Sequence, residues 1–127
     1  MARILIIEDH PINMNLACMM MENAGHEAFR AADAEIGLTM VVSERIDLIL
    51  MDIQLPGMDG LAATRLLKQN PSTASIPIIA VTALAKDDDR KMAFAAGCNA
   101  YIAKPIRYKE LLLAIDGLLQ NGELVIA

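Results

Sequence analysis

Three carboxylates stand where two apolar runs of the chain end. Residues 48–51 are apolar and lead to Asp52, and residues 4–7 are apolar and lead to Glu8 and Asp9. An apolar run that stops at an acid next to a Pro-Gly turn predicts a buried strand that carries the acid to a loop. Carboxylates crowded at strand ends repel one another unless a cation neutralises them. The pattern therefore predicts a metal-assisted site for phosphate chemistry.

Two further polar residues stand at strand ends, Thr82 after an apolar run and Lys104 before a proline. In open α/β sheets, ligands bind outside the carboxyl ends of the strands. The Thr82 hydroxyl and the compact positive charge of Lys104 suit the equatorial oxygens of a transferring phosphoryl group. A carboxylate can be the nucleophile of such a transfer, which would give an aspartyl phosphate.

The expected metal is Mg²⁺, with Mn²⁺ as a possible substitute. Asp9 and Asp52 offer hard oxygen ligands, and the backbone carbonyl of Gln54 can add a third. Glu8 is one methylene longer than an aspartate. We expect it to hold the ion through a water molecule or to pair with Lys104.

The elements that must position these residues alternate along the chain. We expect strands over 3–8, 27–31, 47–52, 77–82 and 99–103, and helices over 12–24, 33–44, 60–69, 86–96 and 107–119. Several strands are apolar without alternation, which is typical of strands covered on both faces. A repeated strand–helix pattern predicts an α/β fold with a parallel sheet, helices on its faces and right-handed crossovers.

The composition narrows the class of protein. A chain of 127 residues fits one domain, and a net charge of −5 without a basic stripe argues against nucleic-acid binding. No apolar run approaches the 18 residues of a membrane span, so a cytoplasmic location is expected. Cys18 and Cys98 are expected to be buried thiols in a reducing compartment. The two histidines lack the spacing of a zinc site.

Other charged and apolar residues have simpler explanations. Asp33 and Asp59 are expected to cap helices, and Asp87, Asp88 and Asp89 to favour the dipole of a first helical turn. The methionines with helical spacing are expected to fill the core, namely Met14, Met19, Met20 and Met21. Residues 1–120 form the expected domain, and 121–127 a tail too short for an output domain.

Taken together, four segments resemble the receiver domain of two-component response regulators, from about residue 2 to residue 120. They are Ile-Glu-Asp at 7–9, Leu-Met-Asp-Ile-Gln-Leu-Pro-Gly-Met-Asp-Gly at 50–60, Val-Thr-Ala at 81–83 and Ala-Lys-Pro at 103–105. The resemblance implies a flavodoxin-like, doubly wound (βα)₅ fold with strand order 2-1-3-4-5. It also implies a signalling domain, which promotes its own phosphorylation and dephosphorylation and is otherwise no enzyme.

The same resemblance assigns roles to individual residues. It implies phosphorylation at Asp52 and Mg²⁺ binding by Glu8, Asp9, Asp52 and the Gln54 carbonyl. It implies phosphate contacts from Thr82 and Lys104, and a switch in which Thr82 moves toward the phosphate while Tyr101 turns inward. The phosphodonor would be a histidine kinase or a histidine phosphotransferase. A downstream protein would bind the face formed by the fourth helix, the fifth strand and the fifth helix.

A narrower similarity points to the DivK-type single-domain regulators of cell cycle and polarity. It rests on residues 51–56, on Asn13 and on the absence of an output domain. The family often has Asp-Asp where this chain has Glu8-Asp9, which puts direct metal coordination by Glu8 in doubt. One alternative is a receiver excised from a hybrid histidine kinase, and another is a binding module with a vestigial site. A third is a Mg²⁺-dependent phosphatase with an aspartyl nucleophile. Such an enzyme needs a general acid two residues after the nucleophile. This chain has Gln54 at that position, and a glutamine cannot give up a proton.

Overall fold

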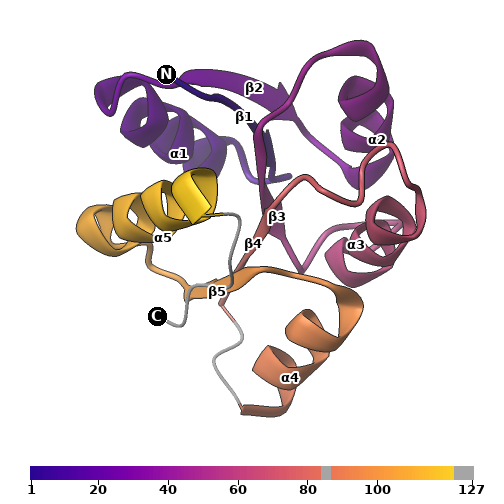
Figure 1. Cartoon of the computed structure of the whole chain (residues 1–127). Coiled ribbons are helices and arrows are strands. Elements are labelled where there is room, and N and C mark those ends of the chain that lie inside the picture. The colour runs from indigo at the N-terminus through magenta and orange to yellow at the C-terminus, as the bar shows by residue number, and fades with distance from the viewer. Residues whose placement is uncertain (84–86, 122–127) are drawn as a thin grey trace.

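A parallel five-stranded sheet forms the centre of the molecule (Figure 1). The computed structural model describes residues 1–83 and 87–121. In chain order the elements are β1 (Arg3–Ile7), α1 (Pro11–Asn23), β2 (Glu27–Ala31), α2 (Ala34–Ser43), β3 (Leu48–Asp52), α3 (Gly60–Gln69), β4 (Ile78–Thr82), α4 (Asp87–Ala96), β5 (Ala100–Ala103) and α5 (Tyr108–Asn121). The strand order is β2-β1-β3-β4-β5, and neighbouring strands run parallel. This is the flavodoxin-like order expected from the sequence.

The helices cover both faces of the sheet in two layers. Helices α1 and α5 pack on one face, with Met21 and Ile115 in a core that also holds Ile4 and Leu50. Helices α2, α3 and α4 pack on the other face over the alternate side chains of the same strands. Every residue of β3 and of β4 is buried, as predicted from their unbroken apolar sequences.

Local sequence signals account for the helix ends. The Asp33 Oδ1 atom accepts from the Ile36 amide at 2.8 Å, and the Asp59 Oδ1 atom accepts from the Ala62 amide at 2.8 Å. Both predicted caps are confirmed. Helix α1 begins one residue earlier than expected because Pro11, which lacks an amide proton, is suited to the first helical position.

Some expectations need correction or lie outside the described part. Met14 and Met21 are buried as expected, but the Met19 side chain is 59% exposed on the outer surface of α1. The prediction that it fills the core is wrong, because the helix turns it away from the sheet. Helix α5 continues to Asn121, beyond the expected end at residue 119, whereas Lys86 and residues 122–127 lie outside the described residues.

Two further sequence expectations concern cysteines and membranes. Cys18 and Cys98 are free and buried, as expected. Within residues 1–83 and 87–121, none of the helices combines the length and apolar character that a membrane crossing requires.

Candidate functional site

The polar residues predicted to share a site follow strands that end at one edge of the sheet. Glu8 comes directly after β1, Asp52 is the last residue of β3, Thr82 the last of β4, and Lys104 comes directly after β5. Because the strands are parallel and adjacent, their carboxyl ends lie side by side. Carboxylate oxygens of Glu8, Asp9 and Asp52 lie within 4.8 Å of one another. The structure therefore brings together the acids that the sequence places at the two strand ends.

Lys104 lies between the two buried acids of this site. Its Nζ atom is 2.8 Å from Glu8 Oε1 and 3.2 Å from Asp52 Oδ2. Both acids are buried, whereas Asp9 is exposed. Of the two roles expected for Glu8, pairing with Lys104 is the one for which the structure supplies a contact.

Backbone amides complete the hydrogen bonding of the buried carboxylates. The Gln54 amide donates to Asp52 Oδ1 at 2.9 Å, and the His10 amide donates to Glu8 Oε2 at 3.0 Å. Each of the four carboxylate oxygens of Glu8 and Asp52 therefore accepts a hydrogen bond from a protein group. These bonds fix the orientation of both carboxylates before any ligand binds.

Burial and charge act on the two acids in opposite directions. Burial raises the pKa of Asp52 to about 6; the Gln54 amide opposes this rise and the nearby charge of Glu8 adds to it. Burial also disfavours the charged form of Glu8, but hydrogen bonds from Lys104 and His10 outweigh it and lower the pKa of Glu8. Burial opposes the charge of Lys104 as well, yet its two acid partners raise the pKa of that ammonium group. The site thus holds more negative charge than Lys104 neutralises.

A divalent cation fits this donor set. The three clustered carboxylates offer the hard oxygen ligands that Mg²⁺ prefers. Burial, with a smaller contribution from the charge of Glu8, raises the pKa of Asp52, so a cation would favour its ionised form. Asp9, as the exposed member, is open to an ion that keeps several waters. Gln54 follows Asp52 closely and is tied to it through its amide. That its carbonyl would add a ligand stays a prediction.

Thr82 and Tyr101 share one face of the sheet near the site. Thr82 is fully buried at the end of β4. Ala80 pairs with Tyr101 across β4 and β5, and side chains two residues apart on a strand point to the same face. Tyr101 is half-buried and packs against the core layer beneath α2, α3 and α4. Burial and the charge of Asp89 raise the pKa of Tyr101, and the charge of Arg90 opposes this rise. Charged residues of α4 therefore influence the ionisation of Tyr101.

Gly60 is a structural requirement of the site that the sequence analysis missed. A Cβ atom on Gly60 would overlap the backbone oxygen of Asp52 and lie 2.7 Å from the Ile53 Cα atom. The first turn of α3 can therefore pack directly against the end of β3 because this residue has no side chain. The glycine that follows the Asp59 cap was a signal for this close approach.

A surface pocket of about 460 Å³ lies beside Lys104. It is lined by Asn13, Leu16, Met20, Lys104, Pro105 and Ile106. Ile12 and Met19 are further exposed apolar side chains of α1. The site thus has an apolar flank on the side of α1.

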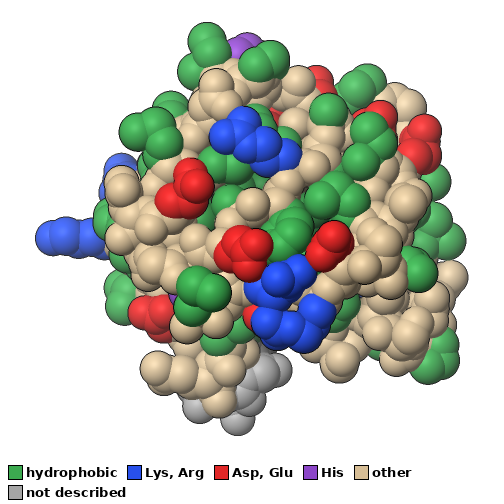
Figure 2. Space-filling view, turned by 90° about the horizontal axis from the view of Figure 1, so that it is seen from above, with side chains coloured by type: hydrophobic (Ala, Val, Ile, Leu, Met, Phe, Trp, Pro, Cys, Tyr) green, Lys and Arg blue, Asp and Glu red, His purple; other side chains and the backbone are tan. Residues whose placement is uncertain are grey.

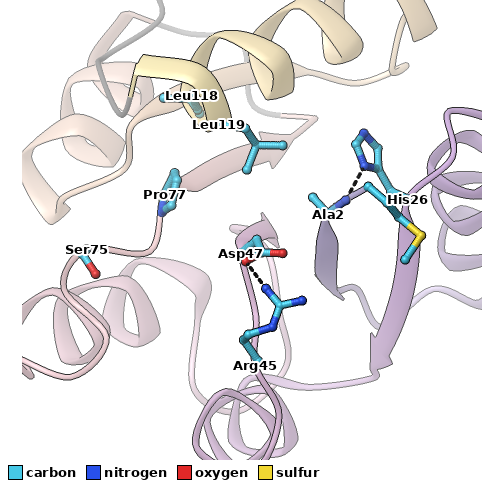
Figure 3. A pocket seen from close by; sticks show the side chains of 9 residues that line it. Ala2, His26, Arg45, Asp47, Ser75, Pro77, Leu118 and Leu119 are labelled. Atoms are coloured by element: carbon cyan, nitrogen blue, oxygen red, sulfur yellow. Dashed lines mark hydrogen bonds and ion pairs between the residues drawn. The ribbon is translucent and has the colours of Figure 1, made fainter.

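A larger cavity, of about 600 Å³, lies at the opposite end of the sheet (Figure 3). Its lining includes Ala2, Asp47 and Pro77, which precede or begin strands, and Leu118 near the end of α5. It is therefore remote from the clustered carboxylates. We assign the chemistry to the carboxyl edge, because Glu8, Asp52 and Lys104 converge there and the pKa of each is shifted.

Comparisons with known proteins agree with this geometry. Residues 4–116 match the family described as the response regulator receiver domain. The chain belongs to this family. The receiver domain is 40% identical over 119 residues to the polar-differentiation response regulator DivK of Brucella anthropi, covering 94% of this chain and 97% of DivK. It is 36% identical to protein PilH of Pseudomonas aeruginosa, covering 94% of this chain and 98% of PilH.

A solved structure extends the comparison to the fold. The receiver domain of a sensor histidine kinase from Pseudomonas aeruginosa PAO1 matches with a TM-score of 0.88 and 34% identity, covering 94% of this chain and 98% of that one. That structure has a magnesium ion coordinated in its active-site cleft. The fold and the family predicted from the sequence are confirmed.

Proposed function

We propose that this receiver domain accepts a phosphoryl group from a phosphohistidine onto Asp52 and signals by phosphorylation-dependent protein binding. The observation that carries the proposal is the buried Asp52 carboxylate, which lies 3.2 Å from Lys104 and within the acid cluster formed with Glu8 and Asp9. Asp52 would attack the phosphorus while the bond from phosphorus to the histidine nitrogen breaks. The electron pair of that bond stays on the imidazole.

Glu8, Asp9, Asp52 and the Gln54 carbonyl are the residues we assign to Mg²⁺. When bound, the ion would offset the negative charge that separates Asp52 from an incoming phosphoryl group. Lys104 would hold one phosphoryl oxygen as a point charge, and the Thr82 hydroxyl would donate to another. The same residues would then promote dephosphorylation by water, which returns the domain to its starting state.

Labelling with radioactive acetyl phosphate in the presence of Mg²⁺ tests this proposal. The wild type should incorporate about one phosphoryl group per chain, with the hydroxylamine sensitivity of an acyl phosphate. Asp52→Asn should incorporate none, and neither should the wild type in EDTA. Asp116→Asn, on the exposed surface of α5, is the matched control and should label like the wild type. Full labelling of Asp52→Asn would refute the assignment of the phosphoacceptor.

The output would depend on Thr82 and Tyr101. A phosphoryl group on Asp52 would draw the Thr82 hydroxyl toward it, which leaves space for Tyr101 on the same sheet face. The surface formed by α4, β5 and α5 would change and bind a downstream protein. Such coupling requires two populated states with different partner affinity. Thr82→Ala should still be phosphorylated, but its affinity for the partner should no longer rise. An equal gain by phosphorylated Thr82→Ala and wild type would exclude Thr82 as the coupling residue.

The phosphodonor is a histidine kinase or a histidine phosphotransferase, and we assign its docking to α1. The pocket beside Lys104, with Leu16 and Met20 in its lining, provides an apolar surface on α1 next to the acid cluster. A donor bound there would bring its phosphohistidine to Asp52. Leu16→Asp should slow transfer from a phosphorylated donor protein while leaving labelling by acetyl phosphate unchanged.

Within the family, we propose a stand-alone cytoplasmic regulator with a role in cell-cycle or polarity control. The alignments to DivK and to PilH that cover nearly the full length of both proteins support this over a receiver of a hybrid histidine kinase. A phosphatase is disfavoured because Gln54 stands where a general acid would be needed. A pull-down with phosphorylated wild type and Asp52→Asn, followed by identification of the retained proteins, would name the partners.

A further inference from the structure

Both carboxylate oxygens of Glu8 already accept hydrogen bonds from the protein. Its Oε1 atom is 2.8 Å from Lys104 Nζ, and its Oε2 atom accepts from the His10 amide at 3.0 Å. Asp52 is the more distant partner of the same ammonium group, at 3.2 Å. Glu8 is also buried, so water screens the pair with Lys104 little.

The length of the Glu8 side chain makes this pairing possible. An aspartate at this position would end one carbon–carbon bond, about 1.5 Å, earlier. From the observed 2.8 Å, an aspartate carboxylate would lie beyond hydrogen-bond distance of the present position of Lys104 Nζ, so the pair would form only if the backbone or the Lys104 side chain moved. A divalent cation that enters the cluster must therefore compete with an ammonium group that Glu8 already holds there.

We propose that Glu8 acts as a latch that holds Lys104 among the carboxylates and thereby weakens Mg²⁺ binding. Glu8 is in this sense a positioning residue, acting through Lys104. The latch sets how much Mg²⁺ the domain needs before Asp52 can be phosphorylated. The inference rests on the proposed function, since it assumes that Mg²⁺ binds this acid cluster.

A double-mutant cycle read by calorimetric titration with Mg²⁺ tests the latch. The four proteins are the wild type, Glu8→Asp, Lys104→Met and the double variant. Glu8→Asp should bind Mg²⁺ about 3- to 10-fold more tightly, because the charge-assisted hydrogen bond from Lys104 to Glu8, which competes with the ion, is lost. Lys104→Met should bind more tightly still. In the Lys104→Met background, Glu8→Asp should add little, because the latch is already absent.

The cycle separates the latch from a simpler explanation. If an aspartate were merely a better ligand than a glutamate, Glu8→Asp would tighten Mg²⁺ binding by the same factor in both backgrounds. That result would overturn the latch, and so would an unchanged or weaker affinity of Glu8→Asp in the wild-type background. The proposed function would stand in both cases. Absence of Mg²⁺ binding in all four proteins would overturn both proposals.

Two controls protect the measurement. Glu22→Asp changes an exposed glutamate of α1 in the same chemical way and should leave the Mg²⁺ affinity unchanged. Urea unfolding in EDTA checks that each variant folds before it is titrated. If Lys104→Met does not fold, Lys104→Gln completes the cycle, since it keeps the length of the side chain and removes its charge.

Discussion

The two ends of the sheet each hold a basic side chain between two acids, but in different surroundings. At the amino end, Arg3 lies 3.2 Å from Glu27 and 2.8 Å from Glu44, whose side chains are 47% and 43% exposed. At the carboxyl end, Lys104 contacts Glu8 and Asp52, whose side chains are 7% and 6% exposed. Similar distances therefore do not mean similar energies, because water screens the first cluster and not the second.

The amino-end cluster has the character of an ordinary surface. Arg3 also lies over the Phe29 ring, at 4.6 Å from its centre. Seen from the side of β2, basic side chains lie next to acidic ones rather than gathering into a basic patch (Figure 2). Acids outnumber the basic side chain at both ends, but only at the carboxyl end are the paired acids buried, and a third acid, Asp9, lies close to them there. Burial of unbalanced charge is what distinguishes a site from a solvated ion pair.

The largest effect should come from removing the basic partner at each end. Lys104→Met leaves buried acids without their ammonium group and should lower the free energy of unfolding in EDTA by about 3 kcal/mol. Arg3→Met removes the basic side chain that lies between the exposed Glu27 and Glu44 at the amino end and should cost about 1 kcal/mol or less. Urea unfolding of both variants measures the contrast. Equal losses would show that burial does not separate the two clusters.

Removal of an acid should change the free energy of unfolding in opposite directions at the two ends of the sheet. With its pKa raised from 3.8 to about 6, ionised Asp52 destabilises the metal-free protein by up to about 3 kcal/mol. Asp52→Asn should therefore be more stable than wild type in EDTA at pH 7.5, by about 2 kcal/mol after the weaker bond to Lys104 is counted. Asp47→Ala should be less stable, by about 1 kcal/mol, because Asp47 accepts from the Arg3 amide and from Arg45.

The pH dependence of the free energy of unfolding, compared between wild type and Asp52→Asn, tests independently whether ionised Asp52 destabilises the protein. Between about pH 4 and pH 6 the folded state holds a proton on Asp52 that the unfolded state has released. The free energy of unfolding should therefore fall as pH rises through this window, and more so for wild type than for Asp52→Asn. Glu8, whose pKa is lowered, contributes in the other direction, with stability lost as pH falls below about 4.5, in both proteins. The difference between the two curves reports Asp52 together with its coupling to Glu8, and a flat difference would contradict the raised pKa of Asp52.

The carboxyl end was more predictable from the sequence than the amino end, for a physical reason. Asp52 and Lys104 each follow an apolar run directly, so strand direction alone places them at one edge. Helix α3 and β2 were predicted with their observed bounds, because a cap or turn residues mark their ends. The pairing of Glu8 with Lys104 remained one of two alternatives, since a strand pattern fixes where a side chain begins and not where its charged end lies.

Contacts between segments far apart in sequence could not be predicted. Lys68 donates to the Ile76 carbonyl at 2.8 Å and to Asn99 Oδ1 at 3.1 Å, and Asn99 Oδ1 also accepts from the Ile78 amide. These bonds join α3 to the amino ends of β4 and β5. A lysine near the end of an amphipathic helix gives no sign of such a role, because its partners are two backbone carbonyls and one side-chain amide in loops. The requirement for Gly60 was missed for a similar reason.

The smallest expected effect tests whether the exposed member of the acid cluster shares its repulsion. Asp9 lies within 4.8 Å of Glu8 and Asp52, but water screens it. Asp9→Asn should therefore raise the melting temperature in EDTA by about 2 °C, which corresponds to roughly 0.5 kcal/mol. The gain should vanish in 1 M NaCl, where exposed charges are screened within about 3 Å. The same variant should show a smaller rise in melting temperature on addition of Mg²⁺, because a ligand is lost. A lower melting temperature than wild type in EDTA would mean that Asp9 is held by attraction to the site, and the imbalance of charge at the carboxyl end would then be confined to Glu8 and Asp52.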